Sequence, residues 1–252
     1  MSLVCLVTGA AGGIGRAVVR RLAEDGLSIL AADLTLDAAR DALTGLPGEG
    51  HRAVSLDVAD ETAVINTFRD AEEAGAPIDA VVAAAGILLF APNGERPPIT
   101  EIELKDWNLT QSVNSTGTFL LMREYLRGAS RRNLRNGRFV GFASVAAQLG
   151  GYRSSSAYIA SKSAVLGLIK AGAREAAHLG ITVNAVAPGL IDAPMLHQSL
   201  DPENYSTVTG SIPLQRVGSP EDVAGAVAFL MGKDASYITG AVIDVNGGYR
   251  MQ

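Results

Sequence analysis

Short apolar, β-branched segments alternate with longer helical patterns along the whole chain, and this alternation restricts the fold more than any other feature. The predicted strands are Leu3–Thr8, Ser28–Ala32, Arg52–Leu56, Ala80–Ala84, Arg138–Phe142, Thr182–Val186 and Ala241–Val245. The predicted helices are Ile14–Asp25, Asp37–Leu43, Glu61–Ala74, Trp107–Ser130, Ala157–His178 and Pro220–Leu230. Strands separated by helices form stacked βαβ units, so we expect an α/β fold with a seven-stranded parallel sheet covered by helices on both faces.

The sequence shows no internal repeat, low-complexity tract or interdomain linker, so we expect residues 1–252 to form one domain. Two longer loops, Leu89–Thr100 and Gly189–Gly218, follow predicted strands four and six. Open α/β sheets bind ligands at the carboxyl ends of their strands, and long ordered loops often act as lids. We therefore expect a substrate lid around residues 189–218, in which His197 is more simply a solvated loop residue than a substrate contact.

The composition is that of an ordinary globular protein, with 48% hydrophobic and 19% charged residues. The net charge of −5 argues against nucleic acid as a partner, because nucleic-acid-binding domains favour a basic surface. The arginine-rich stretch 123–138 could bind an anionic partner, but we favour a solvated helix end.

Other classes of site and location are also disfavoured. The single cysteine, Cys5, lies in an apolar run and is expected to be a buried thiol. Three scattered histidines form no zinc-type set, so we expect no metal. The N-terminus lacks the features of a signal peptide, and no apolar stretch is suited to span a membrane. We therefore expect a cytoplasmic protein without a membrane partner.

A glycine cluster joins the first predicted strand to the first predicted helix. The segment "TGAAGGIGRA" carries Gly9, Gly13 and Gly15, a spacing that differs from GxGxxG. Glycines at such a turn let the backbone approach a pyrophosphate, which then lies at the helix N-terminus. Because glycines are also common in ordinary turns, the cluster indicates a dinucleotide only in its strand–helix context.

An acidic residue follows the second predicted strand. Asp33 can accept hydrogen bonds from an adenosine ribose and would repel a 2′-phosphate. The residues after it, Leu34 to Leu36, include no basic side chain. The pattern therefore favours NAD over NADP, the alternative being a solvated aspartate at a strand end. Asp57 and Val58 follow the third strand, where a carboxylate could meet an adenine amino group or could simply begin a helix.

Together these segments resemble the short-chain dehydrogenase/reductase family over essentially the whole chain, in its compact NAD-dependent form with a Rossmann fold. The resemblance is carried, in order, by the Thr8–Gly15 loop, Asn114, Ser144, the pair Tyr158 and Lys162, and the turn Pro188–Gly189.

The resemblance implies a role for each of these residues. Tyr158 would be the acid/base, Lys162 would also hold the nicotinamide ribose, Ser144 would orient the substrate oxygen, and Asn114 would hold a water. The implied cofactor contacts are Gly9, Gly13, Ile14, Gly15, Asp33, Leu34, Asp57, Val58, Ala84, Ala85, Gly86, Tyr158, Lys162, Pro188, Gly189 and Ile191.

The chain departs from the family pattern at three places. Ala83 stands where the family has a sheet-stapling asparagine, and Ala193 stands where a threonine often lies near the carboxamide. The spacing from Ser144 to Tyr158 is one residue longer than is most common. None of these changes removes an implied catalytic group.

The spacing of Tyr158 and Lys162 suggests how a tyrosine could act as a base. Residues i and i+4 share a helix face, so the two side chains are expected to be neighbours. Lowering a tyrosine pKa from ~10 to ~7 takes about 4 kcal/mol. One ammonium ~4 Å away supplies roughly that energy at an effective dielectric of about 20. Taken alone, the pair could equally be a surface pair on an amphipathic helix.

The function expected from the sequence is NAD-dependent interconversion of a secondary alcohol and a ketone. The alternatives are a 3-oxoacyl thioester (acyl carrier protein) reductase and, from another class, a non-catalytic dinucleotide-sensing protein. The resemblance also implies a homotetramer. Small or apolar residues on more than one face of helices 107–130 and 157–178, such as Gly167, Leu168 and Ala171, give that expectation limited support.

We predict that the protein prefers NAD+ to NADP+, because Asp33 would repel the 2′-phosphate. The measurement is kcat/KM with each cofactor. Replacing Asp33 by alanine and introducing an arginine at a neighbouring position should relax the preference for NAD+. The first change removes repulsion of the 2′-phosphate, and the second adds a partner for it. Equal or better use of NADP+ by the wild-type protein would contradict the prediction.

Overall fold

The computed structural model of the chain, in which residues 3–91 and 93–251 are described, contains a parallel sheet of seven strands in the order β3-β2-β1-β4-β5-β6-β7. The strands are β1 Val4–Thr8, β2 Ser28–Asp33, β3 Arg52–Ser55, β4 Ala80–Ala83, β5 Arg138–Phe142, β6 Thr182–Pro188 and β7 Val242–Val245. The predicted α/β fold and its strands are confirmed, with small shifts at the strand ends.

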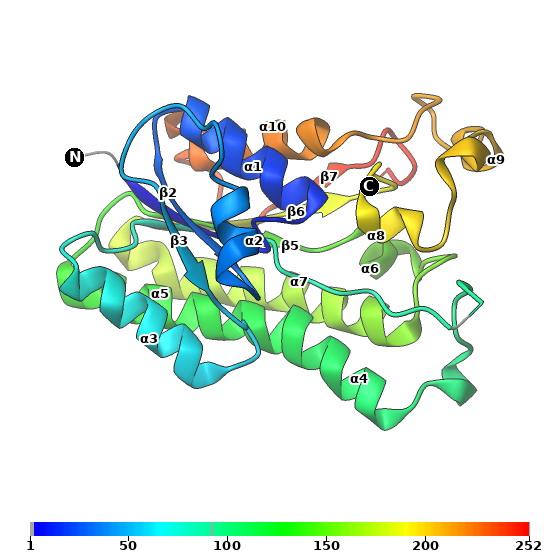
Figure 1. Cartoon of the computed structure of the whole chain (residues 1–252), viewed down its shortest axis with the longest axis horizontal. Helices are drawn as coiled ribbons and strands as arrows, with labels where there is room; N and C mark the ends of the chain where they lie inside the picture. The colour runs from blue at the N-terminus through cyan, green and yellow to red at the C-terminus, as the bar shows by residue number, and fades with distance from the viewer. Residues whose placement is uncertain (1–2, 92, 252) are drawn as a thin grey trace.

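Helices cover both faces of the sheet (Figure 1). They are α1 Gly13–Glu24, α2 Leu36–Asp41, α3 Glu61–Glu73, α4 Leu104–Gln111, α5 Gly117–Arg132, α6 Val145–Leu149, α7 Ser156–Ala176, α8 Pro194–His197, α9 Ser206–Thr209 and α10 Pro220–Met231. Short 3₁₀ turns lie at Ile99–Glu101, Ala177–Leu179, Pro202–Asn204 and Lys233–Ala235.

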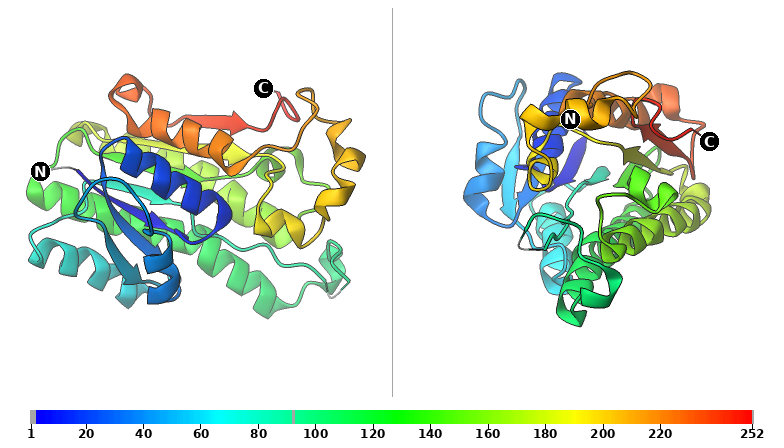
Figure 2. Two further views of the ribbon diagram at one scale, coloured as in Figure 1. Left: turned by 45° about the horizontal axis from the view of Figure 1, so that its top comes forward. Right: turned by 90° about the vertical axis from the view of Figure 1, so that its right-hand side faces the viewer.

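Side-chain alternation along the strands divides the interior into two cores. Leu6 of β1 enters the core shared with α3, α5 and α7, whereas its neighbours Cys5 and Val7 enter the core shared with α1 and α10. This follows from the two-residue period of a strand. Figure 2 shows the sheet between its two layers of helices from two further sides. Cys5 is fully buried, as expected from its apolar run.

The strand order reverses beside β1. The chain runs outward from β1 to β2 and β3, then returns to place β4 on the other side of β1. The carboxyl ends of β1 and β4 therefore flank a crevice, which is where doubly wound sheets bind ligands.

The helix predicted at 107–130 is longer than expected and is not regular throughout. It begins at Leu104, and a π-helical segment, Ser112–Thr116, separates α4 from α5. Segments of this kind widen one helical turn and are frequent at functional sites.

Three short helices were absent from the sequence expectation. The helices α6, α8 and α9 gather at one end of the molecule, beyond the carboxyl ends of β5 and β6 (Figure 1). None of them is long enough to reveal itself by periodicity.

The arginine-rich stretch on α5 is paired with acidic side chains. The contacts join Arg123 to Glu61 (2.7 Å), Arg127 to Glu124 (2.9 Å), Arg131 to Glu72 (3.0 Å) and Arg132 to Asp79 (3.2 Å). Within the described ranges, no helix combines the length and apolarity that a membrane crossing requires.

Candidate functional site

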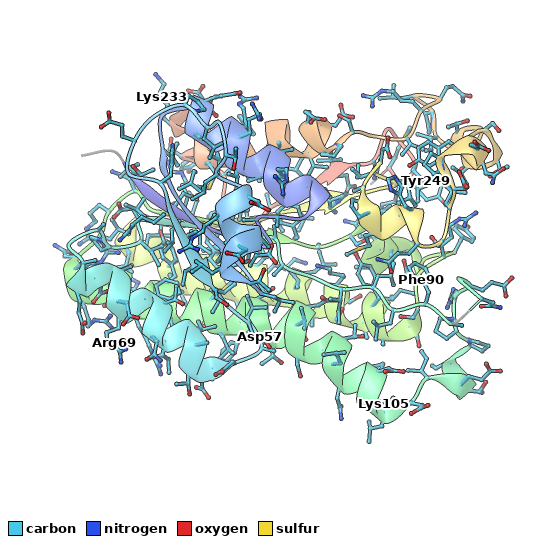
Figure 3. The ribbon with its side chains drawn as sticks, in the orientation of Figure 1. Asp57, Arg69, Phe90, Lys105, Lys233 and Tyr249 are labelled. Carbon is cyan, nitrogen blue, oxygen red and sulfur yellow. The ribbon has the colours of Figure 1, made fainter. Side chains whose placement is uncertain are left out.

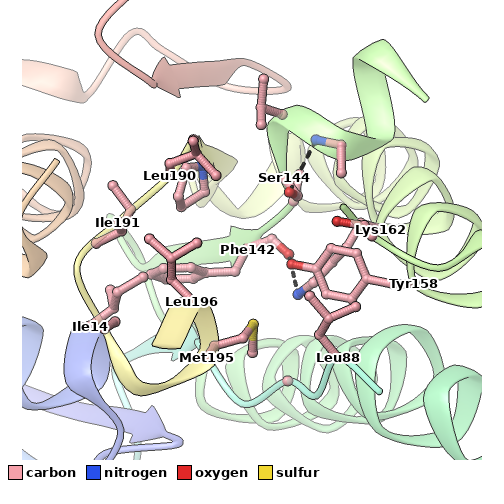
Figure 4. A pocket seen from close by; sticks show the side chains of 18 of the residues that line it. Ile14, Leu88, Phe142, Ser144, Tyr158, Lys162, Leu190, Ile191, Met195 and Leu196 are labelled. Atoms are coloured by element: carbon pink, nitrogen blue, oxygen red, sulfur yellow. Dashed lines mark hydrogen bonds between the residues drawn. The ribbon is translucent and has the colours of Figure 1, made fainter. Parts of the chain in front are cut away.

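A pocket opens at the carboxyl edge of the sheet. Ser144, Tyr158 and Lys162 lie on one side of it, opposite Leu190 and Ile191 (Figure 4). The other labelled lining residues in that view are Ile14, Leu88, Phe142, Met195 and Leu196. The lining is thus mostly apolar, with a few polar groups on one wall, as is typical of small-molecule sites.

Helix α7 positions the tyrosine and the lysine. Ser155 precedes the helix, and its Oγ accepts a hydrogen bond from the backbone N–H of Tyr158 (3.3 Å). This N-cap fixes the first turn. Tyr158 then lies in that turn and Lys162 in the next, on one helix face. Both side chains are buried, so the pair is not a surface pair.

Ser144 comes to the same wall from the end of β5. It caps α6, its Oγ accepting a hydrogen bond from the N–H of Ala146 (3.2 Å). Ser144 and Tyr158 both line this wall, and the serine hydroxyl lies close enough to influence the pKa of the tyrosine. A serine and a tyrosine separated in sequence therefore share one point in the pocket.

Lys162 is directed toward the backbone. Its Nζ donates to the carbonyl of Phe142 (2.9 Å), the bond drawn in Figure 4, and lies 5.8 Å from the centre of the Tyr158 ring. Burial lowers the pKa of Lys162 to about 8, because desolvation disfavours the ammonium.

Burial raises the pKa of Tyr158, and the neighbouring Ser144 hydroxyl opposes the rise. Desolvation is thus the larger influence on this hydroxyl when no nicotinamide is bound. That Lys162 lowers the pKa of Tyr158 during the reaction stays a prediction.

Asn114 lies in the π-helical segment and is fully buried behind the pocket. Its Oδ1 accepts from the N–H of Ile87 (2.8 Å), and its Nδ2 donates to the carbonyl of Ile87 (2.9 Å). The Nδ2 also donates to Ser161 Oγ (3.0 Å) on α7. Asn114 thus joins the segment after β4 to the helix that carries the Tyr–Lys pair, and it is not among the pocket-lining residues.

The glycine loop has the close contacts that a phosphate-binding turn requires. Gly9 has φ +66°, and a Cβ there would lie 2.9 Å from the Cα of Ala85. A Cβ on Gly15 would strike the carbonyl oxygen of Gly9. The glycines therefore let the chain turn tightly into α1, whose N-terminus carries a partial positive charge.

Asp33 lies beside this loop at the end of β2. Its Oδ2 accepts from the N–H of Ala11 (2.9 Å), and its Oδ1 accepts from the N–H of Leu34 (2.9 Å). A bare glycine turn, a helix N-terminus and an acid at the end of the second strand together fit a nicotinamide dinucleotide.

The predicted cofactor residues fall into two groups along the carboxyl edge. Those lining the pocket are Ile14, Ala84, Gly86, Tyr158, Lys162, Pro188, Gly189 and Ile191. The others lie outside the pocket, at or after the ends of β1, β2, β3 and β4. They are Gly9, Gly13, Gly15, Asp33, Leu34, Asp57, Val58 and Ala85. Such an elongated arrangement matches a two-part ligand.

Two positions that depart from the family pattern have clear surroundings. Ala83 is buried in β4, paired with Thr8 and Gly141. Ala193 packs over the glycine loop, so that a Cβ on Gly13 would lie 3.0 Å from the Cβ of Ala193.

The segment 189–218 supplies the apolar wall and is held together by Asp192. The Oδ1 atom of Asp192 accepts from the Tyr205 hydroxyl (2.7 Å) and lies 2.7 Å from His197 Nε2. These hydrogen bonds, with that to His197 the stronger influence, lower the pKa of Asp192. His197 is thus a hydrogen-bond partner of Asp192 and does not line the pocket. Figure 3 shows Tyr249 and Phe90 at this same end of the molecule.

Sequence reasoning missed one charged residue of the pocket. Arg153 lines it together with Ser154 and Ser199. Its only sequence signal was a place in the Ser/Gly-rich run between Ser144 and Tyr158. No group of metal-ligating side chains is found in the parts of the chain that the structure describes.

Comparisons with known proteins agree with this geometry. The family model described as enoyl-(acyl carrier protein) reductase matches residues 9–250. The short-chain dehydrogenase/reductase eriH of Hericium erinaceus is 36% identical, covering 97% of this chain and 96% of the relative. The cis-4-hydroxycyclohexanecarboxylate dehydrogenase of Sinomonas cyclohexanicum is 36% identical, covering 98% and 96%.

A solved structure is similar over the same length. It is that of a candidate NAD(P)-dependent gluconate 5-dehydrogenase from Beutenbergia cavernae, with NADP bound at low occupancy. The TM-score is 0.85 at 34% sequence identity, and the match covers 98% of this chain and 96% of the other.

Burial of Lys162 predicts a pH-dependent stability. Its folded pKa of about 8 lies below the value of a free lysine, so the unfolded chain binds more protons between pH ~8 and ~10.4. Buried Lys162 therefore destabilises the fold most below pH ~8, where it is charged in both states. The free energy of unfolding rises as the pH increases through that range. Relative to Lys162→Met, the wild-type protein should gain on the order of 2 kcal/mol between pH 7 and pH 10.

Urea unfolding of the cofactor-free protein at the two pH values measures this difference. The control is Lys170→Met, which removes an exposed lysine from the same helix and should leave the difference unchanged. A wild-type-to-Lys162→Met difference that does not vary with pH would contradict the prediction.

Proposed function

Because the chain belongs to the short-chain dehydrogenase/reductase family, we propose that it interconverts a secondary alcohol and a ketone with NAD(H). Its relatives support the coarser statement that it is a nicotinamide-dependent oxidoreductase. The observation that carries the finer proposal is the meeting of Tyr158, Ser144 and Lys162 in one apolar pocket beside the glycine loop.

The protein side of the reaction is a proton transfer at the Tyr158 hydroxyl. The substrate oxygen would accept or share hydrogen bonds with Ser144 Oγ and Tyr158 Oη, which line the same wall of the pocket. During oxidation Tyr158 takes the hydroxyl proton, and during reduction it returns one. The nicotinamide, when bound, accepts or donates the hydride.

Lys162 has two roles in this proposal. Its ammonium favours the tyrosinate that forms in the reaction, and the bond to the Phe142 carbonyl uses one of its three N–H donors. A pKa of about 8 also lets Lys162 exchange protons near neutral pH. Asn114 would support the site from behind by fixing Ile87 and Ser161.

The apolar wall keeps water away from the reacting atoms. Leu190, Met195 and Leu196 come from the segment 189–218, which we propose to be the substrate lid. Water exclusion strengthens hydrogen bonds and charge interactions at Tyr158.

NAD is proposed over NADP on the strength of Asp33. Its carboxylate lies beside the glycine loop, where a 2′-phosphate would meet like charge. NADP in the Beutenbergia cavernae structure belongs to that protein, so the comparison of the two cofactors in kinetics decides the matter.

A thioester substrate is the second candidate. It is favoured by a relative, the 3-oxoacyl-[acyl-carrier-protein] reductase FabG of Vibrio harveyi, which is 33% identical over 98% of this chain. Activity on 3-oxoacyl thioesters that exceeds activity on free ketones would favour it over the small-alcohol proposal.

We expect Tyr158→Phe to reduce kcat at least ~100-fold, because only the proton-transfer group is lost. Binding of NADH, followed by its fluorescence, should remain close to wild type. The control Tyr237→Phe removes the hydroxyl of a fully exposed tyrosine and should have no effect. A substantial residual rate in Tyr158→Phe would assign the acid/base role to another group.

We also propose a homotetramer. Ala164, Gly167 and Ala171 form an exposed small-residue face on α7, and Leu109 and Phe119 are exposed on α4 and α5. Faces of this kind are usually buried between copies in closed symmetric oligomers. We also propose that the C-terminal tail packs across a twofold axis; its last residue, Gln252, lies outside the described residues.

Multi-angle light scattering tests the assembly. The expected mass is four times the chain mass of 26.1 kDa. Replacing Ala171 with arginine should lower the mass, whereas the same change at the exposed Ala74, where α3 ends, should leave it unchanged. A wild-type mass near that of one chain would end the proposal.

A further inference from the structure

Arg153 lies on the loop between α6 and α7, in the wall of the pocket that holds Ser144 and Tyr158. The loop turns at Gly150 and Gly151, whose φ values of +82° and +57° are left-handed. This turn brings the partly buried Arg153 back over the pocket. Its Nη1 donates to the carbonyl of Ser199 (2.8 Å), which lies after α8.

The charge of Arg153 is unusual for its position. Among residues 3–91 and 93–251, no carboxylate forms an ion pair with Arg153, although all four arginines of α5 are paired with acidic side chains. No Asp or Glu is among the residues that line the pocket. The other cation there, Lys162, is bound to the Phe142 carbonyl. The pocket therefore presents one guanidinium without a balancing anion.

A guanidinium suits one kind of ligand especially well. It carries five N–H donors in a planar fork, and the one hydrogen bond formed by Arg153 uses a single donor. The fork matches a carboxylate in a bidentate geometry. Apart from Tyr158 and Lys162, which the proposed reaction uses, the other side chains of the lining are serine and apolar ones, so Arg153 is the group that would select a charged substrate.

We infer that Arg153 binds a carboxylate of the substrate, so that the preferred substrates are small hydroxy acids and their keto acids. The inference rests on the proposed alcohol/ketone chemistry at Tyr158. Because Arg153 and Tyr158 line the same pocket, the anion belongs to the small molecule itself and not to a remote part of a long carrier arm.

A purely structural role for Arg153 makes a different prediction. As a brace between the α6–α7 loop and Ser199, it would affect all substrates equally, since the pocket wall would loosen for each of them. A pair of substrates that differ only in charge separates the two roles. The pair is 4-hydroxycyclohexanecarboxylate and its neutral carboxamide, with cyclohexanol as a third substrate.

The experiment compares kcat/KM of the wild-type protein, Arg153→Gln and Arg153→Lys on the matched pair. Arg153→Gln should lower kcat/KM for the carboxylate roughly 10- to 100-fold, mainly through KM, because a charge-assisted hydrogen bond is lost. In the same variant, kcat/KM for the carboxamide should change less than about twofold. Arg153→Lys keeps the charge but lacks the planar fork, so its kcat/KM for the carboxylate should lie between those of the wild-type protein and Arg153→Gln.

The matched control is Arg20→Gln. Arg20 is exposed on α1 and is not among the residues that line the pocket. Its replacement should leave kcat/KM for both substrates unchanged, which would show that loss of one positive charge from the protein is not sufficient.

Three results would overturn the inference. Equal losses on acid and amide in Arg153→Gln would assign Arg153 to bracing, and no loss on either would remove it from recognition. A wild-type protein that oxidises cyclohexanol but not the acid would also exclude carboxylate binding while leaving the proposed function intact. Absence of turnover on every alcohol and ketone tested would instead refute the proposed function itself.

Discussion

Parallel pairing of all seven strands is the constraint on which the rest of this molecule depends. It directs every strand's carboxyl end to the same edge, so segments far apart in sequence must begin their loops side by side. The glycine loop leaves β1, Asp33 ends β2, Ser144 follows β5 and Pro188 ends β6. The site is assembled by topology before any side chain contributes to it.

The two sides of the pocket differ in how firmly they are held. The polar side rests on the sheet and on α7, where Asn114, Ser161 and the Phe142 carbonyl fix the neighbours of Tyr158 through buried hydrogen bonds. The apolar side comes from short helices tied by exposed contacts such as those of Asp192. A firmly held polar side that faces a more loosely held apolar side suits an enzyme that must admit and release substrate.

The sequence was sufficient for the sheet and for the identity of the polar wall, but not for its electrostatics. Apolar runs and the four-residue spacing of Tyr158 and Lys162 are local signals that survive folding. The direction of the Lys162 Nζ and the burial of Tyr158 arise from packing between distant segments. Arg153 was missed for a similar reason, because two left-handed glycines, and no periodic pattern, place it over the pocket.

The π-helical segment Ser112–Thr116 amounts to one additional residue within an otherwise α-helical rod. An α-helix advances each residue by about 100° around its axis, so deleting that residue would restore regular bonding but rotate one half against the other. Either Asn114 would leave Ile87, or the apolar face of α5 would leave the sheet. The wide turn thus lets α5 bury its apolar face against the sheet while Asn114, in the π-helical segment, keeps its hydrogen bonds to Ile87.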